Sequence, residues 1–196
     1  MLFAAGLAFA ADADHRFVND TVGFRVTKPA SWQFLTAQQN LENLKRTEFG
    51  SDEFKQTVVK YSTVPLVIMA QHAEPYDGLN ASFKANIKPF GSLPVRTGKA
   101  VLELIVPSIL QQFADGKIAM PPTDVMVAGR PGAQVVIEYT LRASEGGEFP
   151  TTSEIWIVPI GDYFYLLGAG YAQGDDATHT EIEAIVSSIE LGAATR

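Results

Sequence analysis

The chain has 196 residues, of which 46% are hydrophobic and 19% are charged, and its formal net charge is −7. This length suits one sizeable domain or two small ones, and the apolar content excludes intrinsic disorder. The negative charge argues against a whole-chain electrostatic grip on nucleic acid. Because the chain has no cysteine, disulfides, thiolate metal sites, a cysteine nucleophile and lipidation on cysteine are excluded.

The first thirteen residues have the pattern of a targeting segment. Residues 2–11 form an apolar run of the length found in signal peptides, too short for a membrane span of about 20 residues. Small residues at alternate positions predict cleavage after Ala10 or Ala13. The basic flank is missing, since no Lys or Arg precedes Arg16, and the alternative is an apolar helix packed on the domain. We expect a signal-peptide remnant at 1–13.

The mature chain is then a single domain, residues 14–196, without a transmembrane segment. Alternating apolar residues predict a half-buried strand at 22–27, with 17–19 as its hairpin partner. Thr36 and Gln39 have the spacing of a capping box, which predicts the start of a helix. A second short helix is predicted from Ser51 onward.

The middle of the chain predicts two strands and one long helix. The apolar run 65–70 is typical of a central strand covered on both faces. Residues 80–88 alternate between apolar and polar side chains, as a strand does. A helical stripe predicts a helix from a Thr97 cap to about Phe113, kinked or broken by an internal proline. We expect residues 115–123 to form a loop, either a hinge or a rigid surface loop.

The last third of the chain predicts four strands and a closing helix. The strands are expected around 125–127, 133–141, 153–158 and 163–171. Thr178 and Glu181 have the spacing of a second capping box. The element order, with strands in hairpin-sized pairs, predicts an α+β fold: an α/β/α sandwich around a twisted, mainly antiparallel sheet.

Strand 163–171 is rich in tyrosine and glycine. Tyr163, Tyr165 and Tyr171 share one face, either as a stacking platform or packed under a helix with their hydroxyls reaching water. We favour the packed arrangement. Gly168 and Gly170 share the opposite face, which predicts that a helix crosses closely there.

Both ends of the chain carry a recognisable pattern. Residues 17–32 read FVNDTVGFRVTKPASW and residues 182–189 read IEAIVSSI. The first resembles the start of PsbP-like domains, with aromatic-x-Asn, Gly-Phe, an alternating strand, Pro and Trp. The second resembles their final helix. This superfamily joins photosystem subunits, Ran-binding Mog proteins and bacterial envelope proteins, so the resemblance implies a PsbP-like sandwich but no common catalytic residue or function. Many bacterial relatives are lipoproteins, from which this cysteine-free chain departs.

Motifs that carry chemistry are missing. There is no Gly-x-Ser-x-Gly elbow, no His-Glu-x-x-His and no phosphate-binding loop. Glu138 and Glu154 could face each other across strands, but we favour the interpretation that they lie at a solvated sheet edge or turn. The sequence therefore predicts no catalytic residue, no metal and no cofactor, and a hydrolase with an unrecognised site remains an alternative.

One polar surface stands out around strand 80–88. Successive polar residues on one face of a strand either stay wet or line a groove, because burying them against apolar side chains is costly. A groove of this composition would suit an anionic or amide-rich ligand. The competing interpretation is an edge strand protected from aggregation by its lysines. The candidate surface consists of His72, Tyr76, Asn80, Ser82, Lys84, Asn86 and Lys88.

Two functions follow as hypotheses. The first is an exported, non-catalytic binding or accessory domain, in the periplasm of a bacterium, that binds an unidentified envelope protein. The alternative is a small-ligand-binding domain that uses the polar face of strand 80–88. Neither involves nucleic acid.

Overall fold

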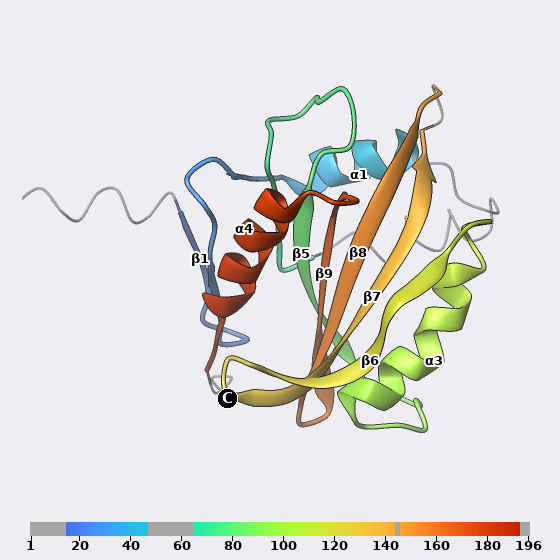
Figure 1. Ribbon diagram of the computed structural model, residues 1–196. Coiled ribbons are helices and arrows are strands. Elements are labelled where there is room, and N and C mark those ends of the chain that lie inside the picture. The colour runs from blue at the N-terminus through green and yellow to red at the C-terminus, as the bar shows by residue number, and fades with distance from the viewer. Residues whose placement is uncertain (1–14, 47–64, 144–145, 193–196) are drawn as a thin grey trace, which may run out of the picture.

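The computed structural model describes residues 15–46, 65–143 and 146–192. In this part of the chain, one sheet has seven strands in the order β3-β4-β5-β9-β8-β7-β6, and another has three in the order β1-β2-β10. Neighbouring strands are antiparallel throughout. The elements, shown in Figure 1, are β1 (Arg16–Asn19), β2 (Phe24–Thr27), β3 (Gln33–Phe34), α1 (Ala37–Arg46), β4 (Val67–Ala70), β5 (Ser82–Pro89), α3 (Gly98–Leu110), β6 (Lys117–Val127), β7 (Arg130–Arg142), β8 (Glu148–Ile160), β9 (Tyr163–Ala172), α4 (Asp176–Ser187) and β10 (Glu190–Leu191).

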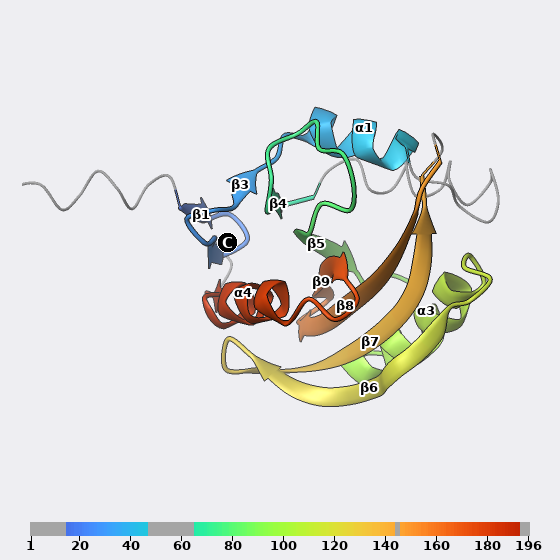
Figure 2. The same ribbon diagram turned by 45° about the horizontal axis from the view of Figure 1, so that its top comes forward.

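Helices cover both faces of the large sheet. Helix α3 packs on β6, β7 and β8, whereas α4 packs on β9 and on β2 of the small sheet. Figure 2 shows α3 and α4 on opposite sides of the curved sheet. The predicted α/β/α sandwich around an antiparallel sheet is therefore confirmed.

The two faces bury separate hydrophobic cores. The larger core lies under α4 and the small sheet, where Phe24, Trp32 and Tyr165 are buried. The second core lies under α3 and includes Leu102 and Ile137. Successive side chains of β5, β8 and β9 point alternately into one core and into the other.

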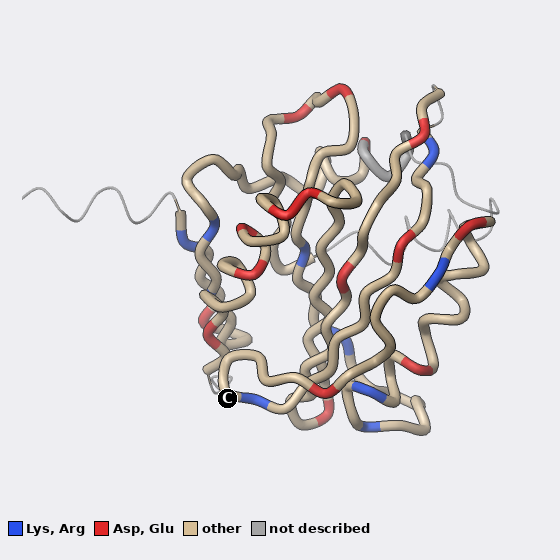
Figure 3. Tube along the Cα trace, in the orientation of Figure 1, with Lys and Arg blue, Asp and Glu red and all other residues tan. Residues whose placement is uncertain are grey.

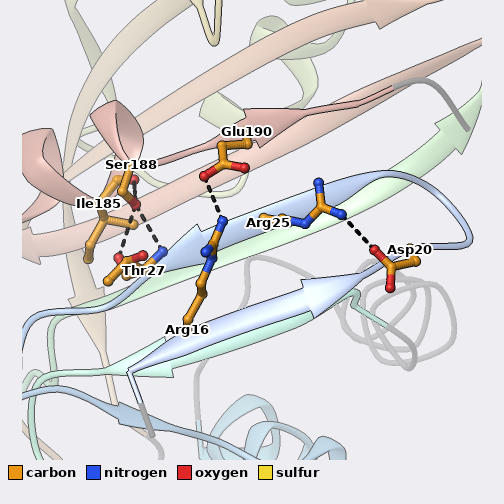
Figure 4. A network of polar contacts seen from close by, with 7 residues as sticks. All are labelled: Arg16, Asp20, Arg25, Thr27, Ile185, Ser188 and Glu190. Atoms are coloured by element: carbon orange, nitrogen blue, oxygen red, sulfur yellow. Dashed lines mark hydrogen bonds and ion pairs between the residues drawn. The ribbon is translucent and has the colours of Figure 1, made fainter. Parts of the chain in front are cut away.

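The small sheet is fastened to the C-terminal end of α4 by polar contacts, shown in Figure 4. The Ser188 hydroxyl accepts from the Thr27 amide (2.9 Å) and donates to the Ile185 carbonyl oxygen (2.7 Å). Exposed ion pairs flank this contact, of which Arg16–Glu190 joins β1 to β10 at 2.7 Å. Such exposed pairs add little stability, so the hydroxyl bridge and the apolar contacts fix the position of the small sheet.

Most predicted elements of the N-terminal half are confirmed. β1 and β2 form the expected hairpin, and β4 is fully buried between β3 and β5. The capping box at Thr36 is formed, since the Gln39 amide nitrogen donates to Thr36 Oγ1 (3.2 Å) and the Thr36 amide nitrogen donates to Gln39 Oε1 (2.9 Å). Helix α3 runs through Pro107 without a break. The helix predicted from Ser51 and the segment 1–13 lie outside the described residues.

Two predictions were wrong. Residues 117–123 belong to the outer strand β6 rather than to a loop or hinge. Its register with β7 shifts between Ile118 and Met120 and again between Met120 and Thr123. The second shift contains Pro121 and Pro122, which cannot donate to a ladder and are tolerated at a sheet edge. The capping box at Thr178 is also absent: Asp175 caps α4 by accepting from the Thr178 amide nitrogen (3.0 Å).

A third correction concerns the close approach of a helix to the sheet. Among the residues that the structure describes, it occurs at Gly98 of α3 and Gly132 of β7 and not at Gly168 and Gly170. A Cβ atom on Gly98 would lie 2.6 Å from the Ile157 carbonyl oxygen, and one on Gly132 would lie 2.8 Å from the same oxygen. Only glycine allows the helix to sit at this depth on β7 and β8.

We predict that Gly98→Ala destabilises the protein, although alanine is normally the better helix former by about 1 kcal/mol. The added methyl group meets backbone atoms that cannot move aside, so we expect the free energy of unfolding to fall by roughly 1–3 kcal/mol. Chemical denaturation measures it, with Lys99→Ala at the exposed neighbouring position as the control. A gain in stability would contradict the close approach.

Candidate functional site

Strand β5 lies inside the large sheet. It pairs with β4 on one side and β9 on the other, over eight residues with β9. The interpretation of strand 80–88 as an edge strand protected by lysines is therefore wrong. Its polar side chains need a different explanation, because both edges of its backbone are satisfied by hydrogen bonds.

The polar residues of β5 point to the α3 side of the sheet. Phe83 and Ala85 are buried in the core under α4, so their neighbours Ser82 and Lys84 face the other way. Helix α3 packs on β6, β7 and β8. The β5 end of this face lies beside the part that α3 covers.

Cross-strand pairing places two short rows of residues side by side on this face. Ser82 lies opposite Gly170, which lies opposite Ser153 of β8. In the next row, Lys84 lies opposite Gly168, which lies opposite Ile155. These rows form a surface that we call the glycine shelf, defined by Ser82, Lys84, Ser153, Ile155, Gly168 and Gly170.

The two glycines leave the centre of the shelf open. Among the described residues, no atom lies within 4 Å of where a Cβ atom of Gly168 or Gly170 would stand, and both glycines are only half-buried. Their φ angles are not positive, and their pairing with β5 and β8 runs without a register shift. Within the described ranges, neither a bulge nor a close backbone approach therefore accounts for these two glycines.

Lys84 forms one side of the shelf. Its side chain is half-buried, and burial lowers the pKa of its amine to about 8. Desolvation has this effect because it disfavours the charged form of a lysine. An anion that contacts the amine would stabilise its charged form.

On the β8 side of the shelf, the polar groups have hydrogen-bond partners and aromatic rings lie nearby. The Ser153 hydroxyl donates to the Ala169 carbonyl oxygen (3.1 Å) and is hydrogen-bonded to Tyr139 of β7. The Tyr139 ring stacks on Phe113, with ring centroids 3.7 Å apart. Burial raises the pKa of Tyr139, so this phenol remains protonated at neutral pH.

The rest of the predicted surface is divided by the structure. Asn86 and Lys88 continue along β5 beyond the shelf, opposite Leu166 and Phe164 of β9. His72, Tyr76 and Asn80 instead lie in the loop between β4 and β5.

This loop is held by its own contacts. The side-chain nitrogen Nδ2 of Asn80 donates to the His72 carbonyl oxygen (2.9 Å) and to Glu74 Oε1 (2.8 Å). The His72 and Tyr76 rings stack at 4.3 Å and are exposed. The predicted surface is therefore two features, a strand face and an ordered loop.

Sequence reasoning missed a cluster around a buried carboxylate on the α4 side of the sheet. Glu154 is 2% exposed. It accepts from Tyr171 (2.7 Å) and Gln134 (2.6 Å), and lies 3.3 Å from His179 Nε2. Burial and the charge and hydrogen bond of Glu154 raise the pKa of Tyr171. Alternation could have found this cluster, since Glu154 occupies an inward position of its strand.

Glu138 and Glu154 do not face each other across neighbouring strands. They lie on one sheet face but are not paired, because Glu138 lies opposite Thr152 and Glu154 lies opposite Val136. Glu138 forms an ion pair with Lys117 at 2.9 Å. The interpretation of Glu154 as a solvated edge residue is therefore wrong.

A carboxylate of α4 also has several hydrogen-bond donors. Glu181, predicted as part of a capping box, accepts instead from Trp32 Nε1 (2.7 Å) and Gln71 Nε2 (3.1 Å). The Ser31 hydroxyl donates to its other oxygen (3.3 Å). These contacts tie α4 to the segments that flank β3 and β4, which is a structural role.

The geometry of a hydrolase is not assembled in the described residues. There, no serine hydroxyl bonds to a histidine, and the closest approach of a histidine to a carboxylate is the 3.3 Å contact of His179 with Glu154. No group of three or more His, Asp or Glu within those ranges could hold a metal ion. Nor is any helix of the described chain long and apolar enough to cross a membrane.

The tyrosines of β9 follow the packed arrangement. Tyr165 and Tyr171 are buried in the core under α4, and the Tyr165 hydroxyl donates to the Val22 carbonyl oxygen at 2.6 Å. Tyr163 is 50% exposed at the start of the strand. The three rings form no stacking platform.

Strand β5 and helix α4 differ in the charges that they carry. Strand β5 carries two lysines and no acid, whereas α4 carries three acids and no Lys or Arg. Figure 3 shows this separation along the chain. The glycine shelf is thus a locally basic feature of an acidic protein.

Comparison with known proteins relates the chain to solved structures alone. No family model and no curated protein matches it. It spans 48% of a Bacteroides thetaiotaomicron protein (13% identity, 91% of this chain, TM-score 0.48). It matches LpqN of Mycobacterium tuberculosis, described as involved in cell envelope biogenesis (13% identity, 93% of this chain, 87% of LpqN, TM-score 0.51). It also matches the cyanobacterial PsbP of Synechocystis sp. PCC 6803 (12% identity, 96% and 99%, TM-score 0.52).

We predict that Lys84→Met stabilises the protein at pH 7 by roughly 1–3 kcal/mol, because it removes the cost of burying a charge. The pKa of Lys84 is about 8 in the folded chain and 10.5 in a free side chain. Between these values the unfolded chain binds more protons, so the stability of the native protein rises with pH. The advantage of the variant should therefore shrink from about pH 8 to 10.5.

Denaturant titrations at pH 7 and pH 10 measure this difference. Lys88→Met, on the same strand, is the matched control. An equal advantage of Lys84→Met at both pH values would show that the charge of Lys84 carries no cost.

Proposed function

Because this chain has the PsbP-like fold and an open shelf beside a half-buried lysine, we propose that it is a non-catalytic binding domain that holds a small ligand on the face of β5. The fold itself hosts unrelated roles. The proposal therefore rests on the site, and above all on the arrangement of Lys84 next to Gly168.

Two features of the shelf support binding rather than a purely structural role. A buried charge lowers stability, and glycine inside a strand costs roughly 0.5–1 kcal/mol relative to alanine. Here both costs fall on directly paired residues, Lys84 and Gly168. Proteins retain such costs at functional sites, where an occupant compensates them.

The second candidate function is that of an accessory domain that binds an envelope protein. The observation in its favour is the ordered loop between β4 and β5, which exposes the stacked rings of His72 and Tyr76. Aromatic side chains with few rotatable bonds are typical anchors of protein interfaces. This surface is separate from the shelf, so variants can distinguish the two functions.

We also propose that the protein is exported and works in the cell envelope of a bacterium. The apolar run and the cleavage pattern of residues 2–13 support this proposal, as does the likeness in fold to LpqN. The mature protein would then begin at Ala11 or Asp14. Intact mass measurement of protein isolated from its native host tests this, and an uncut Met1 chain in the cell extract would contradict it.

Native mass spectrometry tests the binding function. The full protein, expressed in its native host and isolated under mild conditions, should carry a small molecule that is lost in Lys84→Met. It should be kept in Lys88→Met and in the loop variant Tyr76→Ala. Retention of the same molecule by Lys84→Met would contradict a site on the shelf.

Mild crosslinking in the same host tests the accessory function. If a protein partner is captured in equal amount with the native chain, lost in Tyr76→Ala and kept in Lys84→Met, the accessory function is supported. A native chain that carries no small molecule would then leave the loop as the binding surface and overturn the shelf.

A further inference from the structure

The glycine shelf also indicates the chemistry of its ligand, an inference that rests on the proposed function. We propose that the shelf binds a flat, conjugated organic molecule with a single anionic group such as a carboxylate. The flat part lies on the backbone of Gly168 and Gly170, and the anionic group meets the amine of Lys84.

The charge of the site argues for an anion. Lys84 is the one ionisable residue among the six that define the shelf, and β5 contains no acid. Glu138 and Glu154 belong to neighbouring strands but lie on the opposite face of the sheet, since Glu154 is bonded to the core residue Tyr171. Nothing in the shelf itself neutralises the amine.

A single anionic group fits better than a phosphate ester. The shelf offers one lysine, and neither an arginine nor the start of a helix belongs to it. Multiply charged phosphates are usually held by arginine forks, by glycine-rich loops or by helix N-termini. One half-buried amine complements one carboxylate.

The shape of the site argues for a flat ligand. Strands lie about 4.8 Å apart, so the distance from β5 across β9 to β8 is about 10 Å. Within this width the floor consists of bare peptide groups at Gly168 and Gly170, and no atom of the described residues lies within 4 Å of either Cβ position. A ring system can lie parallel to such a floor, whereas any side chain at these positions would lift it.

The sides of the shelf match a molecule with one polar and one apolar end. On the β5 side stand Lys84 and the Ser82 hydroxyl. On the β8 side, Ile155 is buried at the edge of the core under α3 and closes the shelf there. Beyond Ser153 lies the Tyr139 ring, which is stacked on Phe113. An anion on the first side and a ring toward the second satisfy both.

Titration calorimetry with three probes tests this assignment on the full protein at pH 7. The flat anion 2-naphthoate should bind at least tenfold more tightly than the uncharged flat 2-naphthamide. It should also bind at least tenfold more tightly than the bulky anion cyclohexanecarboxylate. Equal binding of the amide would overturn the role of charge, and equal binding of the cyclohexane acid would overturn the flat floor.

Two variants locate the probe. Gly168→Val places a side chain in open space and suits a strand, so its unfolding midpoint should not fall, while 2-naphthoate affinity drops at least tenfold. Lys84→Met should cause a similar loss, and Lys88→Met, about 13 Å along the strand, should stay within twofold. Unchanged affinity in a folded Gly168→Val protein would overturn the proposal.

The pH dependence gives an independent readout. Naphthoate stays anionic above pH 5, whereas Lys84 loses its proton above pH 8. Affinity should therefore fall as pH rises beyond about 8 in the native protein but not in Lys84→Met. Affinity that is flat up to pH 10 would contradict contact with this amine.

These experiments distinguish an error in the ligand class from an error in the binding function. If 2-naphthoate fails to bind but the ligand carried from the native host is lost in Lys84→Met, the ligand class is wrong and the binding function stands. If the native ligand is retained in Lys84→Met, the binding function itself is wrong. Tighter binding of inorganic phosphate than of 2-naphthoate would also overturn the proposed class.

Discussion

The depth at which α3 sits on the sheet is the constraint from which the other features of this face follow. Glycine at positions 98 and 132 lets helix and sheet backbones meet without an intervening side chain. The helix therefore packs on β6, β7 and β8 and buries Leu102 and Ile137 there. A helix of thirteen residues spans about 20 Å, so α3 covers the β6–β8 part of the face and ends short of β5.

Polar groups are treated differently on the two faces of the same sheet. On the α4 side, Glu154 and Glu181 are each surrounded by donors, which turns carboxylates that would be costly to bury into fixed links between α4 and the sheets. On the α3 side, the burial of Lys84 destabilises its charged form, and this lowers its pKa. The first arrangement is what a stable fold needs, and the second is what a binding site needs, since an occupant can complete it.

The sequence predicted the polar face of strand 80–88 but not its meaning. Alternation alone identified Ser82 and Lys84 as facing one way, and it did so correctly, because the period of a strand is set by local geometry. Whether that strand is central or at an edge depends on its pairing with β4 and β9. One loop separates β4 from β5, whereas α3, β6, β7 and β8 lie between β5 and β9 in the chain. The loop residues His72, Tyr76 and Asn80 were grouped with the strand because they are close to it in sequence, although they form a separate feature.

Local chemistry thus determined the order of elements, the α/β/α class, the helix start at Thr36 and the packing of Tyr165, because periodicity and capping act over a few residues. Tertiary structure alone decided which glycines lie against a helix. The strand pattern predicted a close approach at Gly168, but a Cβ atom there would meet no described atom within 4 Å, whereas one on Gly98 would meet the Ile157 carbonyl oxygen. It also decided that Glu181 bonds Trp32 rather than capping its own helix. These outcomes depend on contacts between residues distant in the chain, which no local pattern encodes.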